Sequence, residues 1–502
     1  MELLDNLILG FSVAALPMNL AFCFLGVLLG TMIGVLPGIG PLATISMLLP
    51  LTFGLSPATS LIMLAGIFYG AQYGGSTTAI LVNLPGEASS TVTMIDGYQM
   101  ARRGRAGPAL AAAALGSFFA GTVSTLLVAL VAQPLTSVAL GFGPAEYCSL
   151  MVVGLVSSIA LASGSIIKAL AMIVAGLLLG VTGTDIYTNV PRFTFGFPDL
   201  LDGIDFIAMA VGIFGIAEII RNLEQSGDLK RSVDTKITNL WPSRDDLKRM
   251  VAPVLRGTGI GSFLGILPGG GALLAAFVSY NVEKKFSPNQ AEFGKGAIEG
   301  VAAPESANNA SAQTSFIPML SLGLPATPIM ALMIGAMTIQ GITPGPNVIT
   351  NNPELFWGLI VSMWIGNLML VVLNLPLIGL WVRLLRVPYD LLFPAIVVFC
   401  CIGVYSVGNS PFGMYLVVIS ALVGYFLTKF DCEWAPFILG FVLGPLFEHQ
   451  LRRSMLVYGG DVSVFVTRPV SAVLLVVAVI LLVVITFPMI ARSRKEIFVE
   501  QD

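Results

Sequence analysis

Long apolar segments follow one another along nearly the whole chain. Crossing the ~30 Å hydrocarbon layer of a membrane takes about 20 predominantly apolar residues. Segments of about this size recur with short polar connections between them, and no stretch is left over for a soluble domain. The pattern therefore predicts an all-α polytopic membrane protein with helices near residues 7–35, 40–55, 107–132, 145–164, 166–183, 203–223, 355–381, 389–407, 411–428, 433–448 and 470–491.

A glycine-proline pattern occurs twice inside this apolar sequence, with the copies about 231 positions apart. Glycines four apart give a helix a smooth face that another helix can approach closely. The Pro-Gly steps that follow end the helix, because proline lacks a donor and glycine readily adopts left-handed conformations. The copies are Gly26, Gly30, Gly34 with Leu36, Pro37, Gly38 and Gly40, and Gly257, Gly261, Gly265 with Leu267, Pro268, Gly269 and Gly271.

Helix breaks at matching positions of two halves are the sequence signature of a substrate site in secondary transporters. The apolar arms around 37–40 are short, which favours a re-entrant hairpin there and another at 268–271. The alternative is that the glycines serve only helix packing beside a tight loop. Repetition of the whole pattern favours two related halves with broken helices.

Each half continues into a polar run that we expect to interrupt a helix again. In half one this run covers 69–78 and 83–87, and in half two it covers 303–311 and 321–328. Hydroxyls and amides at such breaks can bind a carboxylate, and each one could instead make an ordinary interhelical hydrogen bond. With the breaks themselves, the candidate substrate-binding residues are Pro37, Gly38, Gly40, Ser76, Thr77, Thr78, Asn83, Pro268, Gly269, Gly271, Ser306, Asn308 and Asn309.

Two acidic residues lie beside these breaks. Glu87 and Glu305 are ionisable groups at membrane depth, which marks them as functional unless they are paired structural acids. They could bind a coupling cation or a proton, and backbone carbonyls freed near Gly86 and Gly323 suit a small cation such as Na⁺. We assign these four residues to a coupling-ion site.

Composition excludes several classes of function. Of the 502 residues 56% are hydrophobic and 11% are charged, against about 25% charged in soluble domains. The net charge of −3 gives no basic field for nucleic acid. The cysteines lack metal-type spacing, the single His449 suits an interfacial position, and Gly294–Gly296 lacks the elements of a phosphate-binding loop. The chain has no visible ATP motor and is not expected to be an enzyme.

Charged loops suggest an orientation for the two halves. Arg102, Arg103 and Arg105 close the polar region of half one, whereas the matching stretch 341–352 is uncharged, so the positive-inside rule places these loops on opposite faces. This predicts inverted repeats. The expected organisation is a first half at 1–224, a cytoplasmic linker at 225–250, a second half at 251–450, and a C-terminal loop and last helix at 451–502 with the C-terminus inside.

Transport of an anion into a negative-inside cell needs a coupled cation. Moving each charge against 100 mV costs about 2.3 kcal/mol, so importing a dianion needs a larger positive charge to travel with it. Cation symport is thus expected for an anionic substrate. A channel or membrane scaffold without coupling stays open as an alternative.

The motifs Gly34–Gly40, Tyr73–Glu87, Asp96–Tyr98 and Pro304–Ala310 together resemble the large membrane subunit of the tripartite tricarboxylate transporters, the TctA type. The resemblance runs from about residue 20 to 450. It implies a permease of about 12 transmembrane segments in the bacterial inner membrane. The implied partners are a small membrane subunit (TctB type) and a periplasmic solute-binding protein (TctC type), and the implied substrate is a carboxylate such as citrate, with Na⁺ or H⁺ coupling and no cofactor. In half two, Thr314 and Ser315 stand where glycines are usual, and Ala326 stands where half one has Gly86.

Overall fold

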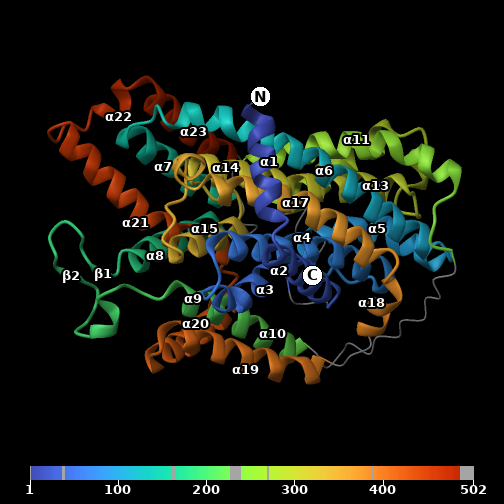
Figure 1. Ribbon diagram of the computed structural model, residues 1–502, viewed down its shortest axis with the longest axis horizontal. Coiled ribbons are helices and arrows are strands. Elements are labelled where there is room, and N and C mark those ends of the chain that lie inside the picture. The colour runs from blue at the N-terminus through green and yellow to red at the C-terminus, as the bar shows by residue number, and fades with distance from the viewer. Residues whose placement is uncertain are drawn as a thin grey trace.

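The computed structural model describes residues 2–36, 40–160, 165–225, 239–267, 271–385 and 389–486. Helices dominate the described chain, as Figure 1 shows. The first part contains α1 Glu2–Ala14, α2 Pro17–Val35, α3 Pro41–Leu48, η1 Leu49–Thr52, α4 Pro57–Val82, η2 Ala88–Ser90, α5 Thr91–Arg102, α6 Ala106–Ala139, α7 Pro144–Ala160, α8 Ile166–Gly180, η3 Pro198–Leu200, α9 Phe206–Ala210, the π-helical η4 Val211–Ile216 and α10 Ala217–Gln225.

The second part begins with α11, after the linker. Its elements are α11 Arg244–Ile266, α12 Gly271–Phe286, η6 Gln290–Glu292, α13 Glu299–Thr314, α14 Phe316–Leu322, α15 Pro328–Ile339, α16 Asn347–Asn351, α17 Pro353–Asn374, α18 Ile378–Leu384, α19 Tyr389–Gly408, α20 Pro411–Lys429, α21 Trp434–Val457, α22 Val464–Thr467 and α23 Pro469–Thr486.

Five helices in the described ranges are long and apolar enough to cross a membrane. They cover Pro17–Val35, Ala106–Ala139, Phe206–Glu224, Pro353–Asn374 and Pro411–Lys429. Shorter apolar helices accompany them, including Pro41–Thr52 and Pro328–Ile339. The prediction of a helical membrane protein is confirmed, and α2 is longer than the short hairpin arm that we expected.

Glycine strips join two pairs of helices at very short range. A Cβ atom on Gly30 of α2 would lie 2.3 Å from the carbonyl oxygen of Ile67 in α4. In the second part, a Cβ atom on Gly261 of α11 would lie 2.2 Å from the carbonyl oxygen of Ala307 in α13. Each seam extends over glycines four residues apart, so the two parts repeat the same α2·α4 and α11·α13 packing.

The helix interruptions also repeat. Helices α2 and α11 end at Val35 and Ile266 with an extended residue after them, as the glycine-proline pattern predicts. Later, α4 and α14 are each followed by a residue in the left-handed conformation, Asn83 with a φ of 58° and Gly323 with a φ of 71°. The tips at 37–39 and 268–270 lie outside the described residues.

The expected break at 69–78 is wrong. Helix α4 runs without interruption through this glycine- and serine-rich stretch and ends only at Val82. The physical reason is that its glycines complete the seam with α2: a Cβ on Gly70 would lie 2.5 Å from the carbonyl oxygen of Val27. Likewise 303–311 lies inside the continuous helix α13, and the break of that half comes at Gly323.

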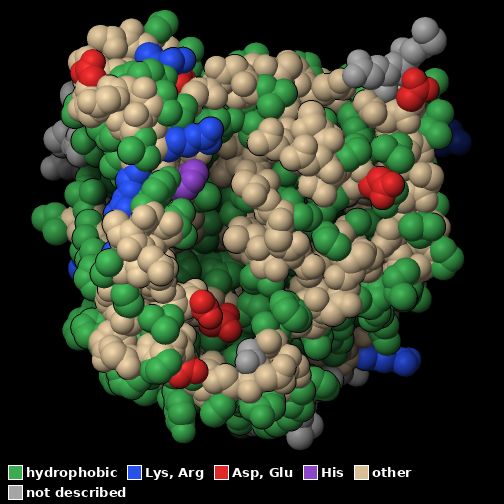
Figure 2. All heavy atoms as spheres, turned by 60° about the vertical axis from the view of Figure 1, so that its left-hand side comes forward, with side chains coloured by type: hydrophobic (Ala, Val, Ile, Leu, Met, Phe, Trp, Pro, Cys, Tyr) green, Lys and Arg blue, Asp and Glu red, His purple; other side chains and the backbone are tan. Residues whose placement is uncertain are grey.

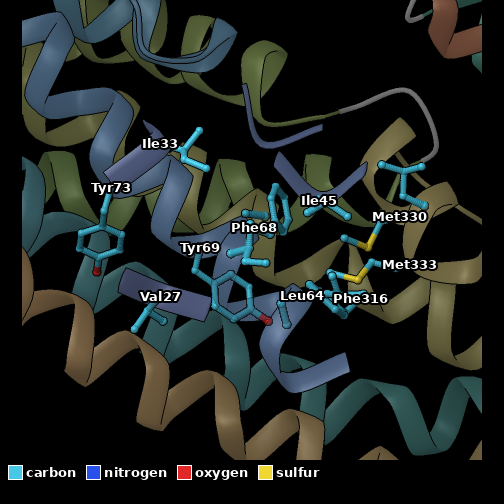
Figure 3. Close-up of a cluster of buried hydrophobic side chains, with 14 of the residues drawn as sticks. Val27, Ile33, Ile45, Leu64, Phe68, Tyr69, Tyr73, Phe316, Met330 and Met333 are labelled. Carbon is cyan, nitrogen blue, oxygen red and sulfur yellow. The ribbon is translucent and has the colours of Figure 1, made fainter. Parts of the chain in front are cut away.

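The apolar core joins the two parts of the chain. Phe68 and Tyr69 of α4 meet Phe316 of α14, with ring centroids 6.4 Å and 6.0 Å from the Phe316 ring. Figure 3 shows these rings beside Met330 and Met333 of α15. Helices far apart in the sequence therefore bury a single hydrophobic cluster.

Asp96 ties the start of α13 to α5. Its carboxylate accepts the backbone N–H groups of Gly296 at 2.7 Å and Ala297 at 2.9 Å, and the Tyr280 hydroxyl at 2.9 Å. The side chain is fully buried. This clamp fixes the loop before α13 and so sets the position of the polar residues on that helix.

A small β-hairpin is the exception to the all-helical prediction. Strands β1 Gly183–Thr184 and β2 Pro191–Arg192 pair antiparallel on one side of the molecule (Figure 1). Arg192 bonds Glu448 at 2.6 Å, and Glu448 also pairs with Arg452. His449 lines a pocket at this corner, and Figure 2 shows the histidine, in purple, beside basic side chains at the edge of a hollow.

Candidate functional site

A buried polar cluster lies where α13 meets α4, α5 and α6. At its centre is Glu305 of α13, whose residue is 1% exposed. Its carboxylate accepts hydrogen bonds from the Ser76 hydroxyl of α4 at 2.6 Å and from the Thr93 hydroxyl of α5. The Ser117 hydroxyl of α6 donates to the Glu305 backbone carbonyl at 3.5 Å. Three helices of the first part thus surround an acid of the second.

The second acid, Glu87, begins the short helix η2 directly after the break at Asn83. It is 8% exposed, and its backbone N–H donates to the Ser90 hydroxyl in a capping box. Its carboxylate accepts from the Ser89 hydroxyl and, at 3.2 Å, from the Asn308 amide of α13. Glu87 and Glu305 are therefore both bonded across the contact between the two parts.

Neither acid has a basic partner in the described part of the chain. The ion pairs found there lie elsewhere, for instance between Arg249 and Glu299 and between Arg256 and Glu283. Transfer of an unpaired carboxylate out of water is strongly unfavourable unless a cation or proton neutralises it. The sequence left open that each acid is a structural residue in an ion pair, and no such ion pair is present among the described residues.

The amides of α13 extend this cluster. Asn309 donates to the Ser117 hydroxyl at 2.7 Å and to the Glu305 carbonyl at 3.2 Å. The side-chain oxygens of Asn308, Ser311 and Gln313 have no partner although they are buried. Buried acceptors without partners are rare in proteins, so each is free to accept a ligand or water.

The other predicted hydroxyls have different roles. Thr78 donates to the carbonyl of Val35 at 2.6 Å, where it satisfies the end of α2. Ser306 donates to Ala302 of its own helix at 2.7 Å, which fits the ordinary structural role. Asn83 is exposed and caps α4 with a φ of 58°. The structure therefore brings Ser76, Asn308 and Asn309 to the acids but does not place Ser306 or Asn83 there.

The glycines assigned to the site act through the backbone. A Cβ on Gly86 would lie 2.1 Å from the carbonyl oxygen of Gly34, so the end of α2 touches the segment before Glu87. Gly323 needs its positive φ of 71°. Gly40 caps α3, and Gly271 starts α12 with a φ of 54°. Pro37, Gly38, Pro268 and Gly269 lie outside the described residues.

A small cavity adjoins Glu305. Its volume is about 10 Å³, the room that a single water molecule needs and far below that of a ligand pocket. Its walls are Tyr73, Ser76, Thr77, Leu110, Ala113, Ala114, Ser117, Glu305 and Asn374.

Several of the partners around the acids were missed from the sequence. Thr93, Ser117, Gln72 and Asn374 were not selected. Ser117 and Asn374 are far along the chain from Glu305, whereas Thr93 follows Glu87 by six residues and was within reach of a local signal.

A larger vestibule lies beside the helix starts. Its volume is about 670 Å³, and it reaches Leu42 near the start of α3, Ala88 next to Glu87, and Pro328 at the start of α15. The opposite wall carries charged side chains of α10 and α20, with Glu224 and Lys429 bonded at 2.7 Å. This space is large enough for a small organic acid.

Comparisons with known proteins identify a family and two relatives. The chain matches the tripartite tricarboxylate transporter TctA family over residues 20–439. It is 61% identical over 502 residues, the full length of both chains, to the "Uncharacterized 52.8 kDa protein in TAR-I ttuC' 3'region" of Agrobacterium vitis. It is 60% identical over 242 residues, 48% of this chain and all of the other, to the "Uncharacterized protein in TAR-II ttuC' 3'region" of the same organism. No solved structure matches it. The family model covers most of the chain, and its apolar helices and buried polar cluster suit a transporter component, so this membrane protein belongs to the tripartite tricarboxylate transporter TctA family.

Proposed function

We propose that the chain is the large permease subunit of a binding-protein-dependent secondary transporter, and that it imports a carboxylate by cation symport. The observation that carries this proposal is the pair of buried acids, Glu87 and Glu305, without a basic partner among the described residues. A cation that enters down its own gradient can neutralise these carboxylates, and this gradient then supplies the energy for the uptake of the anion.

The substrate path passes through the vestibule beside Ala88 and Pro328. The starts of α3 and α15 border this space, and helix N-termini favour negative charge. The tripartite family implies a small membrane subunit and a periplasmic solute-binding protein that delivers the carboxylate. The permease would sit in the bacterial inner membrane with its C-terminus in the cytoplasm.

Inverted repeats with about 12 transmembrane segments form part of the same proposal. The matching glycine seams and left-handed helix ends support two related halves. The basic loop at Arg102–Arg105 and the uncharged stretch 341–352 support opposite orientations in the membrane. Cysteine accessibility at these two loops in intact cells would locate them: labelling of both from the same side would refute the inversion.

Reconstitution of all three components tests the transport proposal. Proteoliposomes that contain this chain and the small subunit, with the cognate binding protein outside, should accumulate a labelled di- or tricarboxylate when a Na⁺ or H⁺ gradient is imposed. Omission of the binding protein is the control. Uptake that equilibrates but never responds to a cation gradient would support a channel instead and would overturn symport.

A further inference from the structure

If both acids are ionised, the two serine hydroxyls that contact them have more acceptors nearby than hydrogens to donate. The Ser76 hydroxyl lies 2.6 Å from the Glu305 carboxylate and 3.2 Å from the Gln72 backbone carbonyl. The Ser89 hydroxyl lies within hydrogen-bond distance of the Glu87 carboxylate and 3.2 Å from the Gln72 side-chain oxygen. A hydroxyl donates one hydrogen, while carbonyls and ionised carboxylates only accept. Each serine thus faces two acceptors with a single hydrogen to give.

One proton on each carboxyl group completes the network. Protonated Glu305 donates to Ser76, whose own hydrogen then serves the Gln72 carbonyl, while Thr93 continues to donate to the other Glu305 oxygen. Protonated Glu87 donates to Ser89 in the same way, and Ser89 donates to the Gln72 side chain. With one proton added to each acid, each of these hydrogen bonds has one donor and one acceptor.

The surroundings of the pair supply no other positive charge. Among the described residues, the titratable group that faces the cluster besides the two acids is Tyr73 of α4, whose hydroxyl donates to Asn367 at 2.7 Å. The charged groups on the other helices packed against α13 are engaged elsewhere: Asp96 of α5 with Tyr280 of α12, Arg256 of α11 with Glu283 of α12, and Arg249 of α11 with Glu299.

We propose that Glu87 and Glu305 are both protonated in this conformation and that the coupling cation is H⁺. This inference rests on the proposed symport function. An O–H bond forms on each acid with a proton from the outer side, and the same bond breaks when the proton is released to the cytoplasm. Two protons carried with a dianion make the transported unit neutral. The membrane potential then does not oppose import, so the pH difference drives it and the excess of positive charge expected from the sequence is not needed.

Proton counting in the reconstituted three-component system tests the inference. In Na⁺-free proteoliposomes that are acidic outside, a labelled dicarboxylate should accumulate, and an external pH dye should report about two protons consumed per substrate. Glu305→Gln and Glu87→Gln each place a permanent amide donor where the proton would be, so each variant should insert normally while its coupling of substrate to protons changes. Each should move one proton fewer per substrate. Glu354→Gln, at an exposed position of α17, is the matched control and should behave as the wild type.

The outcomes separate this inference from the proposed function. Accumulation that requires a Na⁺ gradient and moves no protons would overturn proton coupling and leave symport standing. Accumulation under neither gradient, with all partners present, would overturn symport itself. Infrared spectroscopy of the purified protein adds a readout independent of transport: at neutral pH the carboxylic-acid C=O band should weaken in Glu305→Gln and Glu87→Gln but not in Glu354→Gln. Absence of that band in the wild type would overturn the protonated pair.

Discussion

Replacing Gly261 by alanine should separate α11 from α13 and weaken transport. The new Cβ would lie 2.2 Å from the Ala307 carbonyl oxygen and 2.7 Å from its Cα. Both are backbone atoms that cannot rotate away, so the helices must move apart by about 1 Å to reach ordinary contact at 3.4 Å. Ala307 lies two residues after Glu305, so this movement would also stretch the 2.6 Å bond between Ser76 and Glu305.

Gly259 of the same helix offers a matched control. No atom lies within 4 Å of a Cβ placed there, and the residue is exposed. Both substitutions gain about 1 kcal/mol of helix propensity. The steric cost of overpacking, about 1–3 kcal/mol, applies only to Gly261→Ala, so the two variants should differ in stability by about that amount.

Thermal unfolding of the two purified variants in the same detergent measures this difference, and uptake in proteoliposomes measures its effect on the site. We expect Gly259→Ala to match or exceed the wild type in both assays, and Gly261→Ala to unfold at lower temperature and to lose most uptake. Equal stability and equal uptake of the two variants would refute the close packing of this seam.

Three further substitutions test other parts of the structure. Asn83→Gly should preserve expression and uptake because its φ of 58° suits glycine, whereas Asn83→Val should lower the unfolding temperature by a strain of about 1–3 kcal/mol; equal stability would contradict the left-handed helix end. Asn309→Leu removes the bond to Ser117 and should abolish uptake while membrane insertion, checked by fractionation, stays normal. Arg105 tests a surface ion pair: burial raises the pKa of the Asp246 carboxyl, but the bonds from the Arg105 guanidinium and from Ser243 outweigh it and hold the pKa below its usual value. The stability that this pair contributes is present at pH 7 and is lost as the pH falls through the lowered pKa of Asp246. The difference in unfolding temperature between the wild type and Arg105→Gln should therefore vanish in strong acid. A difference that stays constant with pH would contradict this reasoning.

The sequence predicted the helix ends well because their cause is local. A proline followed directly by glycine favours the end of a helix, and α2 and α11 end just before Leu36-Pro37 and Leu267-Pro268. The glycines at 69–78 led to a wrong prediction of a helix break, since glycine permits both a break and close helix packing. The choice between these outcomes depends on whether a partner helix lies opposite, and α2 does so here.

The acids were identified from the sequence, as were their partners Ser76 and Asn308, but other partners were not. An ionisable residue in an apolar stretch is visible in one dimension, so Glu87 and Glu305 could be selected. Thr93 and Ser117 reach Glu305 only because α5 and α6 pack against α13, which no local pattern encodes. Conversely, Ser306 and Ser76 both lie in polar runs of the sequence, but the Ser306 hydroxyl donates to a carbonyl of its own helix whereas the Ser76 hydroxyl donates to Glu305.

The shared polar cluster limits how the two parts of the chain can move. Ser76 and Thr93 belong to the first part and Glu305 to the second, so drawing these parts apart would leave several donors and acceptors unpaired within the membrane. Each such group would cost several kcal/mol. Around Glu305 these hydrogen bonds therefore oppose any movement that separates the two parts of the chain.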